Sequence, residues 1–123
     1  RLADGVEALT VPAVFWINIV GVWAVIAAAL WLSLRVHPGW GLVAAYLLLV
    51  NALAHGGQAL VLRSPNPGLW TGLALFLPLG AVLWWHLWPQ ASPLQHLLSI
   101  ALVALIHAAI FAGVARARKA GHR

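Results

Sequence analysis

The chain has 123 residues, of which 63% are hydrophobic and only 7% are charged. Soluble domains contain about 25% charged residues, so this composition excludes a disordered chain and an ordinary water-soluble enzyme. Cysteine is absent, which excludes disulfides, thiol catalysis and thiolate metal sites. The net charge of +5 would suggest nucleic acid as the partner of a soluble protein. The basic residues gather from Arg116 onward, however, so membrane lipids with anionic headgroups are the expected partner, and no nucleic acid is expected.

Uncharged stretches cover residues 8–34, 36–62 and 64–115. Apolar runs of about 20 residues or more predict helices that cross a membrane. We predict an all-α fold, a polytopic integral membrane protein in which four antiparallel transmembrane helices form one bundle and a single domain, 1–123. The four spans are approximately 11–34, 40–62, 69–88 and 94–115. Short loops favour antiparallel neighbours, and Pro78 is expected to kink the third span.

The distribution of basic residues predicts the orientation of these spans. Of the seven Lys and Arg residues, six lie in the two ends of the chain or at Arg63, which the four spans place on one side of the membrane. Only Arg35 lies on the opposite side. The positive-inside rule therefore places both ends in the cytoplasm. Tryptophans at the predicted outer end of the third span, Trp84, Trp85 and Trp88, fit the depth of the headgroups. We expect a multi-pass protein of the cytoplasmic (inner) membrane.

Polar side chains inside the spans are the candidate functional residues. Asn18, His55 and His107 come from three different spans, and each lies about 10–12 Å from the cytoplasmic end of its helix at 1.5 Å per residue. We predict that these three side chains converge. Asn51 and Gln58 share a helical face with His55 and are expected to support the cluster.

The chemistry of this cluster leaves three interpretations open. The side chains can form hydrogen bonds between helices and nothing more. They can bind a divalent metal, with His55, His107, Asn18 and Asn51 as candidate ligands. They can also hold a b-type haem or a pigment, with His55 and His107 as candidate axial ligands. No conventional catalytic motif occurs, so catalytic residues and an enzymatic activity are not assigned.

The second and third spans carry a longer pattern. It reads Asn51-Ala-Leu-Ala-His55, then Arg63, then Asn66-Pro67-Gly68-Leu69-Trp70-Thr71, then Leu77-Pro78-Leu79, with Phe15-Trp16-Ile17-Asn18 upstream. This pattern resembles the HXXEE-motif family of small, uncharacterised bacterial membrane proteins. The resemblance implies a location in the bacterial inner membrane and the candidate residues Asn18, Asn51 and His55, but it implies no activity.

The His-x-x-Glu-Glu sequence that names this family does not occur in the chain. The resemblance therefore leads us to expect a missing N-terminal helix that carries this motif. Its histidine and two glutamates would complete a metal site in the bundle. The other hypothesis is a non-catalytic accessory subunit of a larger energy-converting membrane complex. It is suggested by the Gly- and Ala-rich helix surfaces and by the absence of a domain outside the membrane.

Overall fold

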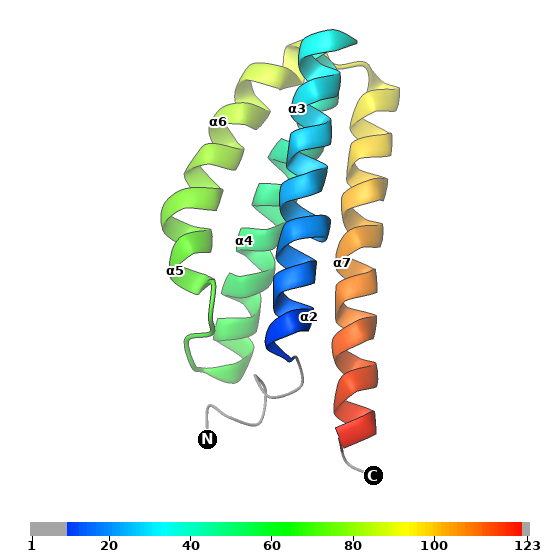
Figure 1. Ribbon diagram of the computed structural model, residues 1–123. Coiled ribbons are helices and arrows are strands. Elements are labelled where there is room, and N and C mark those ends of the chain that lie inside the picture. Colours follow the sequence, from blue (N-terminus) through cyan, green and yellow to red (C-terminus); the bar gives the residue numbers. More distant parts are fainter. Residues whose placement is uncertain (1–9, 122–123) are drawn as a thin grey trace.

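The computed structural model describes residues 10–121, and every regular element in that range is a helix (Figure 1). The predicted all-α class is therefore confirmed. Four helical segments in this part of the chain are long and apolar enough to cross a membrane, namely Pro12–Arg35, Pro38–Leu62, Leu69–Gln90 and Pro93–Ala117. Figure 1 shows the turns that precede α4 and α7 at one end of the molecule, with the loop between α4 and α5 at the other end.

The first span consists of α2 (Val11–Trp16), the π-helix η1 (Ile17–Ala24) and α3 (Val25–Arg35). Thr10 caps its start, because its hydroxyl oxygen accepts a hydrogen bond of 3.3 Å from the Ala13 amide. Pro12 occupies the first turn, where a missing N–H has no consequence. In a π-helix the backbone hydrogen bonds run to the fifth residue instead of the fourth, so η1 interrupts an otherwise α-helical span.

The second span begins with the 3₁₀ turn η2 (Pro38–Gly41) and continues as α4 (Leu42–Leu62). This helix is central, since it packs against α3, α6 and α7. Its buried residues all lie in its first half: Leu42, Val43, Ala44, Ala45, Leu47, Leu48 and Ala52. No residue in the range 53–62 is buried. The bundle is therefore well packed around the first half of α4 and loosely packed around the second.

The third span is the least regular. It consists of α5 (Leu69–Thr71), the π-helix η3 (Gly72–Phe76), α6 (Leu77–Leu87) and the 3₁₀ turn η4 (Trp88–Gln90). The π-helix η3 ends two residues before Pro78, which lies in the first turn of α6, and the kink expected at Pro78 stays a prediction. Gly80 brings α6 close to α4, because a Cβ atom at this position would lie 2.9 Å from Leu49 Cγ.

The fourth span is a single helix, α7 (Pro93–Gly121). Ser92 and Gln95 form a capping box at its start: the Gln95 amide donates to Ser92 Oγ at 3.2 Å, and the Ser92 amide donates to Gln95 Oε1 at 2.9 Å. The side of α7 that faces the bundle buries every fourth residue, namely Gln95, Ser99, Val103 and His107. Three of these four are polar.

Candidate functional site

His55 and the loop residue Asn66 form two hydrogen bonds. Asn66 Nδ2 donates to the carbonyl oxygen of His55 at 2.8 Å. Because a carbonyl oxygen can only accept, this bond fixes the orientation of the amide, and Asn66 Oδ1 then lies 2.7 Å from His55 Nδ1. Nδ1 must therefore carry the proton and donate. In the uncharged tautomer that carries this proton, Nε2 has the lone pair.

The His55 ring packs against Gly68. This glycine has a φ of +94°, and a Cβ atom on it would lie 2.7 Å from Cε1 and 2.8 Å from Nε2 of the ring. Asn66 accepts a hydrogen bond of 3.1 Å from the Leu69 amide, which closes a β-turn with Pro67 and Gly68 at its centre. A positive φ at the third position defines a type II turn and favours glycine there. His55, Asn66 and Gly68 thus form one structural unit, which ties the loop to α4.

His107 is buried on α7 and is 7% exposed. Its Nδ1 lies 2.9 Å from the Val103 carbonyl oxygen, so Nδ1 is again the donor, and in the uncharged tautomer Nε2 has the lone pair. This Nε2 atom has no hydrogen-bond partner among the described residues, and neither has the buried Oγ of Ser99. A buried polar atom without a partner costs roughly 1–3 kcal/mol by mutational measures. The inner side of α7 therefore carries two unsatisfied polar atoms.

The structure places the predicted site residues in different surroundings. Asn18 is exposed, and its Nδ2 donates to the Val14 carbonyl oxygen at 2.8 Å. Asn51 is half-buried. Across residues 10–121, no hydrogen bond joins Asn18, His55 and His107. Nor do three His, Cys, Asp or Glu side chains of that range gather as a metal-binding group. The metal and cofactor roles of His55, His107, Asn18 and Asn51 stay predictions.

Two further histidines form contacts that sequence reasoning missed. His37 Nδ1 accepts hydrogen bonds from the Gly39 amide at 3.1 Å and from Gln95 Nε2 at 3.2 Å. His96 Nδ1 lies 2.9 Å from the Tyr46 hydroxyl. These contacts join α4 and the turn before it to the start of α7. The capping-box pattern at Ser92-x-x-Gln95 was the one signal in the sequence that pointed to this region.

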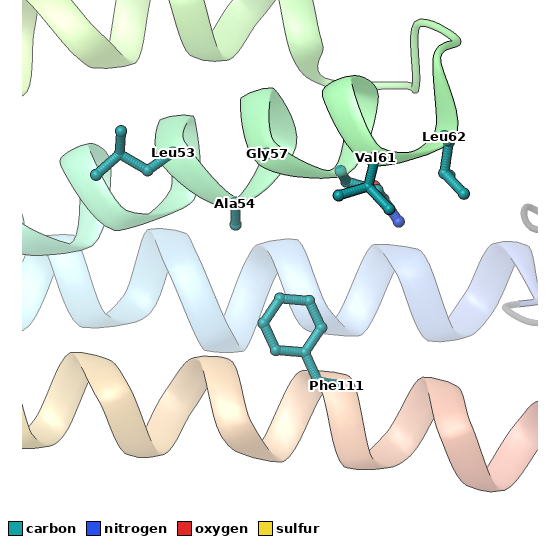
Figure 2. A pocket seen from close by; sticks show the side chains of 7 residues that line it. Leu53, Ala54, Gly57, Val61, Leu62 and Phe111 are labelled. Carbon is teal, nitrogen blue, oxygen red and sulfur yellow. The ribbon is translucent and has the colours of Figure 1, made fainter.

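A groove lies between α7 and the second half of α4 (Figure 2). Its volume is about 400 Å³, and its lining consists of Leu53, Ala54, Gly57, Gln58, Val61, Leu62 and Phe111. Figure 2 shows the Phe111 ring pointing from α7 to the side on which α4 lies, with the ribbon of the first span drawn between the two helices in this view. A Cβ atom added at Gly56 or Gly57 would meet no atom within 4 Å. The space beside Gly56 and Gly57 on α4 is therefore open.

A comparison with protein families matches the same family that the pattern in the second and third spans resembles. The family model described as "Protein of unknown function with HXXEE motif" matches residues 4–83. This match spans about two thirds of the chain and includes Asn18, Asn51 and the unit formed by His55, Asn66 and Gly68. No curated protein and no solved structure matches the chain.

Proposed function

This chain belongs to the HXXEE family, and from that premise we propose that it is a multi-pass membrane protein that acts through helix–helix association, as a non-catalytic subunit of a larger membrane assembly. Its four candidate spans contain 22 to 25 residues each. At 1.5 Å per residue these lengths suit a hydrocarbon layer of about 30 Å. In this proposal the spans are antiparallel, and the excess of basic residues keeps both ends in the cytoplasm.

The observation that carries the proposal is the exposed side of α4 at Gly57 and Gln58, which lines the groove beside α7. Exposed leucines and valines are suited to lipid and need no protein neighbour. Gly57 and Gln58 are exposed on the same helix, and the side-chain carboxamide of Gln58 does not suit lipid tails. The side-chain carboxamide of Gln58 forms no hydrogen bond within residues 10–121, and lipid tails offer no hydrogen-bonding group. Small residues and amides are typical of the surfaces through which membrane helices associate.

The mass of the assembly in lipid tests this proposal. The protein would be extracted from its native membrane directly into lipid nanodiscs, without detergent, and its mass would be measured by light scattering. We expect a complex of fixed stoichiometry, either of several copies or with another membrane polypeptide. A folded monomer at every protein concentration would contradict the proposal.

Metal or haem binding is the second candidate function, and the lone pairs on Nε2 of His55 and of His107 favour it. Imidazole nitrogen ligates zinc at about 2.0–2.1 Å, and it is also the usual axial ligand of haem iron. Each imidazole ring supplies one metal ligand, whereas a zinc site needs three or four protein ligands. The imidazole and two carboxylates of an HXXEE motif are suitable additional ligands, so a helix that carries this motif would complete such a site.

Elemental analysis and an absorption spectrum test the second candidate. They would be recorded for the chain alone and for the chain co-expressed with a helix that carries the HXXEE motif. We expect bound metal or a Soret band that disappears in His55→Gln and in His107→Gln, while the helical circular dichroism is unchanged. The absence of both metal and pigment from the co-expressed protein would contradict this second candidate function.

A further inference from the structure

We propose that His37, Gly39 and Gln95 form a pH-sensitive latch, which joins the turn before α4 to the start of α7 and opens when the His37 ring is protonated. His37 Nδ1 lies 3.1 Å from the amide nitrogen of Gly39 and 3.2 Å from Nε2 of Gln95. The latch consists of contacts within one chain. It therefore does not depend on the proposed association with other chains.

Both groups that contact Nδ1 of His37 are hydrogen-bond donors. The backbone amide of Gly39 can only donate. The Gln95 carboxamide is held in one orientation, because its Oε1 accepts a hydrogen bond of 2.9 Å from the Ser92 amide and its Nε2 then faces His37. Nδ1 of His37 must therefore carry a lone pair, and the proton of the uncharged ring lies on Nε2.

Protonation of His37 places a hydrogen on Nδ1 and removes the acceptor of both bonds. Rotation of the Gln95 carboxamide would offer Oε1 to the charged ring, but it would break the bond from the Ser92 amide. The space is also tight, because a Cβ atom on Gly39 would lie 2.8 Å from Gln95 Cδ and 3.0 Å from Ala91 Cα. Gly39 and Gln95 are buried, so a donor that loses His37 as its partner destabilises the closed latch.

The groups around His37 offer no compensation for a positive charge. His37 is exposed between the first two candidate spans, so protons can reach it from water. It caps η2, and η2 packs against α3, α4, α6, α7 and η4. The titratable or charged side chains of these elements at this end are Arg35, Tyr46, His86 and His96. Residues 10–121 contain no Asp or Glu, so no carboxylate of that range can pair with the charged ring.

His96 lies at the same end and differs from His37 in its response to a proton. Its Nε2 lies 3.4 Å from the Trp88 carbonyl oxygen, so Nε2 donates and Nδ1 accepts from the Tyr46 hydroxyl. A hydroxyl can also accept, so both bonds can persist when His96 is charged. The centroid of the Trp88 ring lies 4.2 Å from that of His96, and an indole attracts a nearby cation. We therefore assign the acid-sensitive contact to His37.

Reversible unfolding in mixed micelles at pH 8 and at pH 5 tests the latch, because imidazole takes up a proton in this range. His37→Asn is the decisive variant. Its carboxamide oxygen can accept a hydrogen bond from the Gly39 amide, as Asn does at helix caps, and it does not titrate. Each net hydrogen bond corresponds to roughly 2–10-fold in an equilibrium constant. We expect acidification to increase the unfolding constant of the natural protein by roughly 4–100-fold more than that of His37→Asn.

A distance measurement tests whether the two elements separate. Spin labels would be attached at Leu34→Cys and Leu97→Cys, which are exposed positions on α3 and α7 in a chain without natural cysteine. We expect the distribution of distances between the labels to broaden at pH 5, and to stay unchanged when His37→Asn is added. His96→Gln is the control, and it should keep the pH response of the natural protein.

Three results would overturn this inference. One is an equal pH response of the natural protein and His37→Asn, and another is loss of the response in His96→Gln. The third is a distance distribution that is the same at pH 8 and pH 5. This third measurement leaves His37 in place, so it decides the matter even if His37→Asn does not fold. A folded monomer in lipid would contradict the proposed function and leave the latch intact.

Discussion

Gly68→Ala tests whether the contact between His55 and the loop stabilises the fold. The substitution adds one methyl group at a residue that has a φ of +94°. The added Cβ atom would lie 2.7 Å from Cε1 and 2.8 Å from Nε2 of the His55 ring, which is closer than van der Waals contact permits. The ring cannot rotate away freely, because Asn66 Oδ1 holds its Nδ1 at 2.7 Å.

The expected loss of stability has two parts. A residue with a side chain in the left-handed region costs about 1–2 kcal/mol relative to glycine. Forcing a methyl group into a filled space costs about 1–3 kcal/mol more, since the ring or the loop must shift. We therefore expect Gly68→Ala to lower the free energy of unfolding by about 2–5 kcal/mol.

Reversible unfolding in mixed micelles, followed by far-ultraviolet circular dichroism, measures this loss. Gly113→Ala is the matched control, because its added Cβ atom would meet nothing within 4 Å and the residue lies inside α7. That control should leave stability unchanged or raise it by up to about 1 kcal/mol, since alanine favours helix over glycine. Equal stabilities of Gly68→Ala and Gly113→Ala would refute the role assigned to the His55 contact.

Three further substitutions have predictable effects in the same unfolding assay. Arg63→Gly should raise stability by roughly 0.5–1 kcal/mol, because Arg63 ends α4 with a φ of 49°, where glycine is preferred; a loss would mean that the guanidinium itself stabilises the fold. Gly80→Ala should lower stability by about 1–3 kcal/mol, because its Cβ atom would press on Leu49; no loss would show that α6 can move away from α4. Gln95→Ala should lower stability by about 1–2 kcal/mol, because it removes the helix cap and the hydrogen bond to His37. A loss no larger than that of Gln90→Ala, at an exposed residue, would contradict the stabilising role of the Gln95 side chain.

The sequence predicted the helical segments because membrane-crossing helices need about 20 apolar residues, and the breaks between such runs are visible in the composition. The end of the fourth span was less predictable. Hydropathy marks where a membrane would end, whereas α7 continues to Gly121. Its extension is rich in Ala, Arg and Lys, which favour helix in water as well.

The sequence could not predict which groups surround the candidate residues. The pairing of His55 with Asn66 depends on the backbone path of the turn between them, and helical spacing does not encode that path. The depth of Asn18 was estimated from a uniform α-helix, but this residue lies inside the π-helix η1. Wider turns change the direction in which a side chain points, so depth alone could not show that Asn18 is exposed.

The π-helix in the first span also changes how this chain tolerates insertions and deletions. A π turn holds one residue more than the α-helical turn it replaces, so η1 contains an additional residue relative to a regular α-helix. A one-residue deletion within η1 can be absorbed there by conversion to α-helix, and α3 beyond it keeps its orientation. The same deletion in the first half of α4 would rotate every later residue of that helix by about 100°. Because α4 packs against three other helices, that rotation would turn all of its later contacts away from their partners at once.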